Sequence, residues 1–167
     1  MVFATVADKI ALEKEMPWAD RDVPTTIYQL LTQTKNRIPK NNAFSYQLLS
    51  GPQDKSETLT WLDLHKKVTQ TANLFRFLGI NKEDVIAFIL PNCNETIYTL
   101  LGGAVAGVVN PINPLLGAEQ IGSILRETNA KIVVTLKSFP KTEVAQNAAQ
   151  AVSLAPNVKT ILEIDLN

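Results

Sequence analysis

Polar residues that could do chemistry lie between Pro91 and Glu95, directly after an apolar run of the sequence. Asn92 and Glu95 have the spacing of a capping box, in which the first side chain caps a helix and the second bonds back to the cap. A helix N-terminus that follows a strand can also hold an anion. We therefore predict a helix that begins at Asn92 with Glu95 in its first turn, and ligand contact at this point is the alternative.

The single cysteine and the single histidine, Cys93 and His65, are the other candidates for catalytic chemistry. A position beside a helix start can lower the pKa of a thiol. A catalytic cysteine would still need a histidine base, so we predict instead that Cys93 is a small buried side chain. His65 follows Leu64 on an amphipathic segment, and we expect it to point to solvent.

Other catalytic patterns are absent from the sequence. One cysteine excludes an internal disulfide framework, and one histidine excludes a Cys/His metal cluster. There is no serine-centred elbow and no carboxylate pair, and the glycine-rich segment LGGAVAG (101–107) lacks the lysine of a phosphate-binding loop. We therefore assign no catalytic residue and no metal ligand, and the cofactor-binding residues stay undefined.

The segment NPINP, Asn110 to Pro114, marks the end of an apolar run. Proline cannot donate to a β-ladder, so Pro111 predicts that its strand lies at a sheet edge or stops there. Asn113 could then project into a crevice. We favour the simpler interpretation, in which the two prolines and Asn113 form a turn between a strand and a helix.

Regular alternation of strands and helices must position these segments. Short runs rich in Val and Ile are separated by segments of helical periodicity, which is typical of a parallel sheet covered on both faces. Right-handed crossovers then give an α/β fold with a three-layer, doubly wound, mainly parallel sheet. The predicted strands are DVIAFIL (84–90), GVVNPI (107–112), KIVVTL (131–136) and TILEIDL (160–166).

An antiparallel hairpin is expected to be appended to this sheet. In AFSYQLL (43–49), Phe44, Tyr46 and Leu48 alternate on one face, and TLTW (58–61) resumes the strand pattern after polar turn residues. Two helices flank the hairpin. The first begins at Thr25 or Thr26 and ends before Pro39, and the second begins at a Thr60/Asp63 capping box and is closed by Gly79.

Residues 1–24 show no clean period and predict an N-terminal arm, whereas residues 25–167 form the α/β domain. We expect the arm to lie over the domain surface and Trp18 to hold it there. Asp8, Lys9 and Glu13 follow Met1 where a secretory signal would be basic and then apolar. We therefore expect a cytoplasmic protein.

Charge and hydrophobicity exclude two classes of partner. Sixteen basic and sixteen acidic residues cancel, so no global field favours nucleic acid or an anionic membrane surface. The apolar run Ile97 to Val109 is shorter than the ~20 residues that span a bilayer, so we expect no transmembrane segment. Gly103 and Gly107 instead indicate a helix packed closely under a sheet.

Two segments resemble the adenylate-forming enzymes, which include fatty acyl-CoA and aryl-CoA synthetases, luciferases and the adenylation domains of peptide synthetases. LTWLDLHKKVTQTANLF (59–75) and LLGGAVAGVVNPINPLL (100–116) look like the first two core motifs of that family, in the same order and at the same separation. The resemblance covers Thr25 to about Asp165. VVNPINPLL (108–116) looks more like the acyl-CoA and aryl-CoA ligase branch than like the branch that activates amino acids.

The resemblance implies an activity for a parent enzyme of which this chain is the N-terminal part. That parent would activate a carboxylic acid with Mg-ATP, release pyrophosphate, and transfer the acyl group from acyl-AMP to the thiol of coenzyme A. In the family, the groups that grip ATP lie downstream of the two motifs, so we expect residues 1–167 alone to be inactive. The chain's partners would be the remainder of the parent and, through exposed apolar surface, a second copy in a homodimer. The alternative is a stand-alone α/β binding or interaction module without catalysis.

Overall fold

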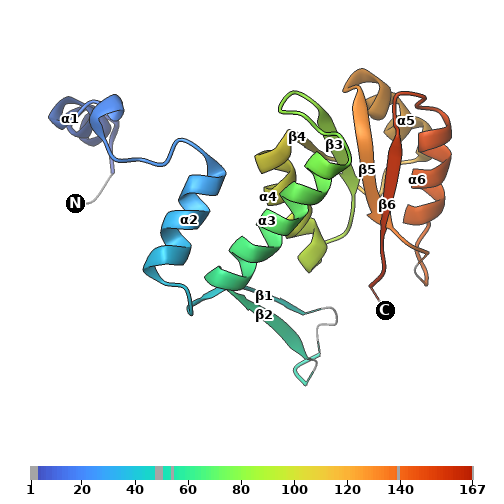
Figure 1. The fold of residues 1–167 in the computed structure, drawn as a ribbon, viewed down its shortest axis with the longest axis horizontal. Helices are drawn as coiled ribbons and strands as arrows, with labels where there is room; N and C mark the ends of the chain where they lie inside the picture. Colours follow the sequence, from blue (N-terminus) through green and yellow to red (C-terminus); the bar gives the residue numbers. More distant parts are fainter. Residues whose placement is uncertain (1–3, 48–50, 54, 139, 167) are drawn as a thin grey trace.

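The structure, a computed structural model, describes residues 4–47, 51–53, 55–138 and 140–166 of the 167-residue chain (Figure 1). The helices are α1 (Val6–Glu15), α2 (Ile27–Arg37), α3 (Trp61–Phe77), α4 (Asn94–Ala106), α5 (Ala118–Glu127) and α6 (Val144–Ser153), with a 3₁₀ turn η1 (Trp18–Asp20). The strands are β1 (Asn42–Gln47), β2 (Ser56–Thr60), β3 (Val85–Ile89), β4 (Val108–Pro111), β5 (Ala130–Leu136) and β6 (Thr160–Ile164).

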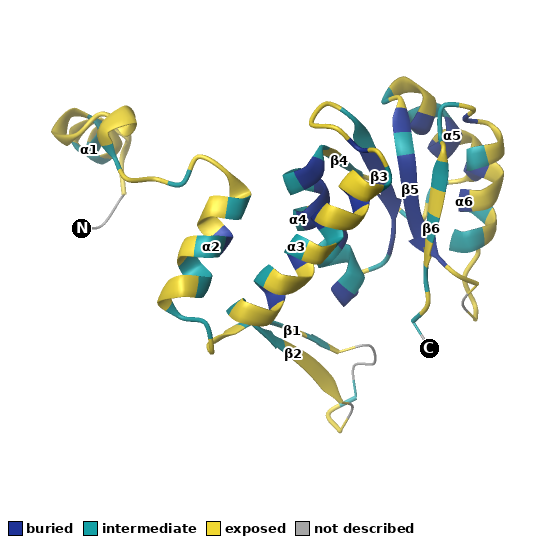
Figure 2. Cartoon of the chain, in the orientation of Figure 1, coloured by how far each residue is buried: buried dark blue, intermediate teal, exposed yellow. Residues whose placement is uncertain are grey.

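Four parallel strands form the central sheet in the order β4-β3-β5-β6. Side chains of β3 alternate between its two faces: Ile86 and Phe88 join a buried cluster with α3 and α4, whereas Ala87 and Ile89 join a cluster with α5 and α6. Figure 2 shows the buried sheet lying between these helices. The predicted fold class is therefore confirmed, with three layers and a doubly wound parallel sheet.

Small residues let α4 approach its neighbours closely. A Cβ atom added at Gly102 would lie 2.7 Å from Thr71 Cβ on α3, and one added at Gly103 would lie 3.3 Å from Val109 Cβ on β4. The apolar run from Ile97 is thus the buried helix that its glycines indicated. Among the described residues, no helix is long and apolar enough to cross a membrane.

The strand β4, whose sequence continues into NPINP, has a position in the sheet that Pro111 permits. β4 is an edge strand of the sheet and Pro111 is its last residue, so both conditions that Pro111 imposed are met. Asn113 Oδ1 accepts a hydrogen bond from the backbone N–H of Leu115 at 3.0 Å. This is the turn that we favoured for NPINP over a side chain that enters a crevice.

The predicted hairpin and its flanking helices are also present. β1 and β2 pair antiparallel in a two-stranded sheet of their own, with Ser45 opposite Thr58. Leu48, which we placed on the same face as Tyr46, lies outside the described residues. Thr26 caps α2, and α3 ends before Gly79, whose φ of +88° is the left-handed conformation that favours glycine after a helix.

Thr60 caps α3 through a reciprocal pair of hydrogen bonds. Its Oγ1 accepts from the backbone N–H of Asp63 at 3.2 Å, and the Asp63 carboxylate accepts from the backbone N–H of Thr60, also at 3.2 Å. The Thr60 hydroxyl also donates to the Asp63 carboxylate at 2.6 Å, and this hydrogen bond, followed by the one from the Thr60 backbone, holds the pKa of Asp63 below its ordinary value.

Thr60→Ala should therefore destabilise the chain by about 1 kcal/mol, because it removes the cap of its longest helix. Urea unfolding followed by circular dichroism measures this loss. Gln70→Ala, an exposed substitution on the same helix, is the control and should change stability by less than about 0.5 kcal/mol. Equal stability of the two variants would contradict the capping role.

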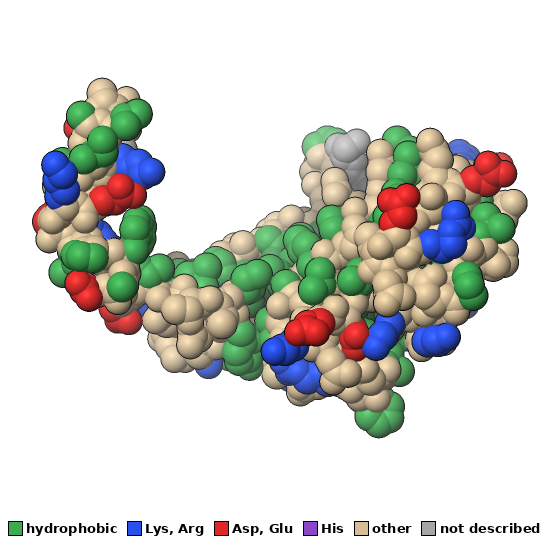
Figure 3. All heavy atoms as spheres, turned by 90° about the horizontal axis from the view of Figure 1, so that it is seen from above, with side chains coloured by type: hydrophobic (Ala, Val, Ile, Leu, Met, Phe, Trp, Pro, Cys, Tyr) green, Lys and Arg blue, Asp and Glu red, His purple; other side chains and the backbone are tan. Residues whose placement is uncertain are grey.

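The N-terminal arm differs from its prediction in two respects. Residues 6–15 form α1, which starts at a Thr5/Asp8 capping box although the segment has no apolar stripe. Trp18 is 59% exposed, and its contacts are with Glu13 and Arg21 of the arm itself. The expectation that Trp18 holds the arm on the domain is therefore wrong, and Figure 3 shows the arm as a separate lobe.

Candidate functional site

The order of the strands defines a topological switch point between β3 and β5. The chain leaves β3 through α4 to reach β4 on one side, and then returns through α5 to β5 on the other side of β3. In open α/β sheets, ligands bind beyond the carboxyl ends of the strands at such a point, where the two connections diverge. The loops that follow these strands are therefore the candidate site.

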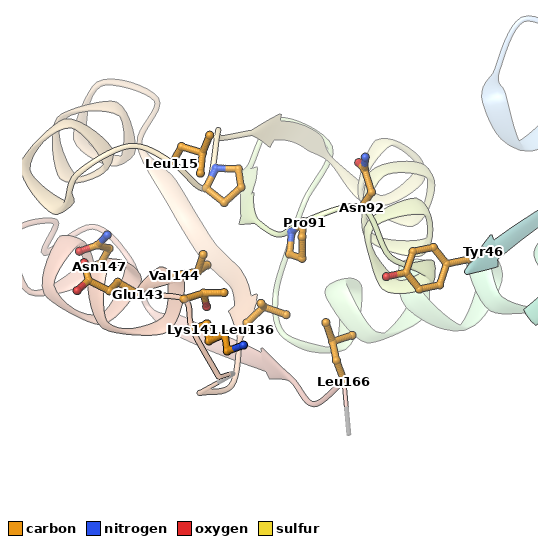
Figure 4. Close-up of a pocket in the computed structure, with 12 residues that line it drawn as sticks. Tyr46, Pro91, Asn92, Leu115, Leu136, Lys141, Glu143, Val144, Asn147 and Leu166 are labelled. Carbon is orange, nitrogen blue, oxygen red and sulfur yellow. The ribbon is translucent and has the colours of Figure 1, made fainter. Parts of the chain in front are cut away.

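A cavity of 620 Å³ lies at this switch point (Figure 4). The loops after β3, β4 and β5 contribute to it, together with β1 of the hairpin and the residue that follows β6 by two positions. Its lining residues are Tyr46, Pro91, Asn92, Pro114, Leu115, Leu136, Lys141, Thr142, Glu143, Val144, Asn147 and Leu166. We call it the switch-point cavity. It has apolar walls with a few polar groups, which is the usual character of a small-molecule site.

Polar groups of the switch-point cavity gather around the start of α6. Lys141 and Thr142 precede the helix, and Asn147 lies one turn inside it. Figure 4 shows Lys141 and Asn147 at this end of the cavity. The N-terminal N–H groups of a helix and a nearby ammonium group favour an anion, whereas Glu143 in the N-cap position opposes one. This end of the cavity therefore suits a polar group, and the opposite wall at Pro91 and Leu115 suits an apolar one.

Asn92 lines the switch-point cavity but does not cap α4. The N-cap residue is Cys93, so the third position of the helix is Thr96 and not Glu95. Thr96 Oγ1 donates to the carbonyl oxygen of Pro91 and lies 3.1 Å from Cys93 Sγ. The predicted Asn92/Glu95 capping box is therefore wrong, because the N-cap of α4 lies one residue later than the spacing suggested. Glu95 lines a neighbouring cavity instead.

Cys93 is buried, as predicted from the sequence. Burial raises the pKa of its thiol, which outweighs the hydrogen bonds from Thr96 that lower it. The side chain is therefore a neutral thiol at neutral pH. It packs at the start of α4 and lines none of the described cavities as a nucleophile would.

His65 does not point to solvent, and that expectation is wrong. Its Nε2 lies 3.0 Å from Thr32 Oγ1 on α2, and its ring lies 5.0 Å from the ring of Tyr28. The Thr32 hydroxyl already donates to the Tyr28 carbonyl oxygen, so His65 Nε2–H is the donor to Thr32. The packing of α2 against this side of α3 partly covers the histidine, which the sequence of α3 alone does not reveal.

The docking of α2 on α3 should weaken at mildly acidic pH. Burial, and then the positive charge of Lys35 on α2, lower the pKa of His65 from its ordinary 6.5. As the pH falls below 6.5, the His65 side chain is protonated in the unfolded chain before it is protonated in the folded chain. The stabilisation that comes from neutral His65 is therefore fully present above pH 6.5 and is lost as the pH falls from there through the lower pKa of the folded chain. Urea midpoints measured from about pH 7.5 to about pH 5.5 should fall in the native chain and fall less in His65→Gln. Parallel curves for the two proteins would contradict this origin.

Comparison with known proteins identifies the family. Residues 31–167 match the family described as AMP-binding enzyme. The chain belongs to the AMP-binding enzyme family. The match confirms the resemblance to adenylate-forming enzymes.

Curated relatives of this AMP-binding chain are CoA ligases. It is 31% identical over 131 residues to the marinolic acid–CoA ligase of Pseudoalteromonas sp. (strain SANK 73390), which covers 78% of this chain and 20% of the relative. It is 40% identical over 81 residues to the crotonobetaine/carnitine–CoA ligase of Escherichia coli (strain K12 / DH10B), which covers 48% of this chain and 16% of the relative. The chain thus spans about a fifth of the length of the curated relatives that it matches.

Solved structures share the fold of this AMP-binding chain. The Mycobacterium tuberculosis fatty acyl CoA synthetase superposes with a TM-score of 0.67 at 23% identity, over 83% of this chain and 26% of that one. The anthranilate CoA ligase AuaEII, solved in complex with anthranoyl-AMP, superposes with a TM-score of 0.72 at 17% identity, over 89% of this chain and 27% of that one. At these identities the likeness concerns the fold.

Several residues of the switch-point cavity in this AMP-binding chain were missed by sequence reasoning. Lys141 and Asn147 follow β5, and Tyr46 belongs to the hairpin. The rule for open sheets could have directed attention to the loop after β5 as well as to the loop after β3. Among the described residues, no three His, Cys, Asp or Glu side chains are grouped to hold a metal ion, so we assign none to magnesium.

Proposed function

We propose that this chain forms the N-terminal part of an ATP-dependent, AMP-forming acyl-CoA synthetase. The reaction converts a carboxylate, ATP and coenzyme A to acyl-CoA, AMP and pyrophosphate through an acyl-adenylate. The family match over residues 31–167 supports this proposal most directly, and the curated relatives are CoA ligases. Fatty and aromatic carboxylic acids are the substrate classes to test.

In this proposal the described residues supply the scaffold and one wall of a site. Attack of a carboxylate on the α-phosphorus of ATP requires cationic groups and a metal ion around the phosphates. Mg²⁺ supplies part of that charge when it is bound with ATP, and we route no step through a residue of this chain. We therefore propose that residues 1–167 alone do not catalyse adenylation.

A pyrophosphate-release assay tests both statements. It compares the 167-residue chain with a protein that continues beyond Asn167, each with ATP, Mg²⁺ and a panel of fatty and aromatic acids. We expect release only from the longer protein, and only with some acids. Pyrophosphate release from the 167-residue chain would overturn the proposed inactivity, and failure of the longer protein with every acid would overturn the ligase assignment.

The switch-point cavity supports the alternative function, that of a stand-alone binding module without catalysis. Its volume of 620 Å³ is sufficient for a small molecule within this chain alone. A binding module without catalysis should then bind ATP or an acyl-CoA saturably in calorimetry. Saturable micromolar binding by the 167-residue chain would favour that rival, whereas the synthetase proposal predicts negligible ATP binding.

We also propose that the 167-residue chain self-associates and that the protein is cytoplasmic. Leu115 at the mouth of the switch-point cavity is 88% exposed, and Phe77 at the end of α3 is 87% exposed. Exposed apolar side chains of this size favour association. Sedimentation at increasing concentration should show a dimer, and a monomer throughout would contradict this. Cell fractionation tests the location.

A further inference from the structure

A second cavity adjoins the switch-point cavity and has a different character. It measures 390 Å³ and shares Tyr46 and Leu166 with its neighbour. It lies between the hairpin, the start of α4 and the end of β6. Its other lining residues are Lys55, Ser56, Glu57, Asn94, Glu95 and Asp165. We call it the Asn94 cavity.

Asn94 carries an acceptor that the described residues leave unsatisfied. The residue is the first of α4 and is only 5% exposed. Its Nδ2 donates to the carboxylate of Glu57 on β2. Its Oδ1 is buried and accepts no hydrogen bond from any residue that the structure describes. A buried acceptor without a donor is costly, so the missing partner should be a hydrogen-bond donor.

The charges around Asn94 indicate that this donor is a cation. Asp165 is paired with Lys137 at 3.1 Å, so Glu57 and Glu95 carry the remaining negative charge against Lys55. The pKa of a nearby tyrosine on α4 reflects these negative charges. Burial, followed by the charges of Glu95 and Glu57, raises the pKa of Tyr98 to about 12.

An anion is the less favourable occupant of this cavity. The start of α4 contributes the equivalent of about half a positive charge, which is less than either carboxylate. An anion would also leave Asn94 Oδ1 without a donor. A metal ion is disfavoured too, because no three acidic, His or Cys groups are placed to hold one among the described residues.

We propose that the Asn94 cavity binds a nitrogen cation that carries N–H donors, an alkylammonium or alkylguanidinium group. Asn94 Oδ1 is closed to solvent in this structure, so the Asn94 side chain must turn for the cation to donate to it. The carboxylates of Glu57 and Glu95 balance the charge. A guanidinium fits a carboxylate with two parallel hydrogen bonds, and the volume of 390 Å³ leaves room for its alkyl chain. The inference does not depend on the proposed function.

Titration of the ¹⁵N-labelled 167-residue chain tests this proposal by NMR. Ethylguanidinium and ethylammonium chloride are the probes, and tetramethylammonium chloride is the matched control because it has the same charge and no N–H. We expect saturable shifts of the Asn94 side-chain amide with both probes and none with the control. Absence of saturation, or an equal response to tetramethylammonium, would overturn the proposal.

Two variants separate binding from folding. Glu95→Gln removes one charge and should weaken binding about two- to fivefold, the range for a partly exposed ion pair. Asn94→Leu removes the acceptor and should abolish the saturable shifts, followed here at the backbone amides of Glu57 and Glu95, while the thermal unfolding midpoint shows that the chain still folds. Glu119→Gln, in the first turn of α5, changes the same charge away from the cavity and should bind as the native chain does. Native binding by both Glu95→Gln and Asn94→Leu would overturn the proposal.

The source of the cation is resolved by repeating the titration on a protein that continues beyond Asn167. If the probes bind the 167-residue chain but not the longer protein, a Lys or Arg side chain of the longer protein fills the cavity. If they bind both, the natural ligand is a free amine or guanidine. Failure of binding in both proteins overturns the proposal and leaves the synthetase assignment untouched, since that rests on pyrophosphate release.

Discussion

Phe75→Ala is expected to lower the free energy of unfolding by about 3–5 kcal/mol, the largest effect that we predict for one side chain. Phe75 is 1% exposed on α3 and is among the largest fully buried side chains of the described residues. It packs in the cluster that joins α3 and α4 to Ile86 and Phe88 of β3. Truncation would leave a cavity that these neighbours cannot fill, because the sheet backbone fixes their positions.

The same helix provides a control for that substitution. Phe77 is two residues further along α3 and is 87% exposed. Phe77→Ala makes the same chemical change and should alter stability by less than about 0.5 kcal/mol. Urea unfolding with the slope and midpoint fitted separately measures both. A similar loss in the two variants would contradict burial as its cause, because alanine favours the helix over phenylalanine at both positions.

The sheet could be predicted because its strands have a clear pattern in the sequence. β3 and β5 are buried on both faces, so their residues form nearly continuous apolar runs. Pro111 alone predicted that β4 lies at a sheet edge or stops there, and both are observed. The start of α3 followed from Thr60 and Asp63, whose capping hydrogen bonds join residues three apart in the sequence. Each of these features has a sequence signal that lies within a few neighbouring residues.

The errors concern features that depend on distant contacts or on small offsets. His65 is covered by α2, which is separated from it by the hairpin, so the periodicity of α3 could not indicate its surroundings. Asn92 and Glu95 have capping-box spacing, but Thr96 forms the local bonds and shifts the start of α4. α1 has a cap without an apolar stripe, and a search for periodicity overlooks such a helix.

The candidate site could be predicted only in part for a related reason. Sequence reasoning directed attention to the loop after β3 and so found Asn92. The opposite wall, with Lys141 and Asn147, comes from the loop after β5 and from α6. Those segments meet across the sheet because β5 lies beside β3, although β4 intervenes in the sequence. Strand order was the missing information.

Gly107→Ala is expected to destabilise the chain by about 2 kcal/mol. An added Cβ would lie 2.6 Å from the carbonyl oxygen of Asp84 and 2.9 Å from that of Asn81. Both are backbone atoms. The Asp84 carbonyl oxygen also accepts a hydrogen bond from the N–H of Val108 at 2.9 Å, at the start of β4. The substitution must therefore displace the junction where β3 and β4 begin, because no side chain can move aside to relieve the contact.

Gly103→Ala, inside α4, is the control for Gly107→Ala, because it adds the same methyl group without a clash against backbone atoms. Its added Cβ would meet only side-chain atoms, with Val109 Cβ at 3.3 Å, and alanine improves helix propensity by about 1 kcal/mol over glycine. The close contact with Val109 and the gain in helix propensity oppose each other, so the loss of stability should be smaller than for Gly107→Ala. Equal urea midpoints for the two variants would show that the turn at Asp84 moves aside at little cost in free energy. A larger loss for Gly107→Ala would show that the backbone contact between this turn and the end of α4 positions β4 at the edge of the sheet.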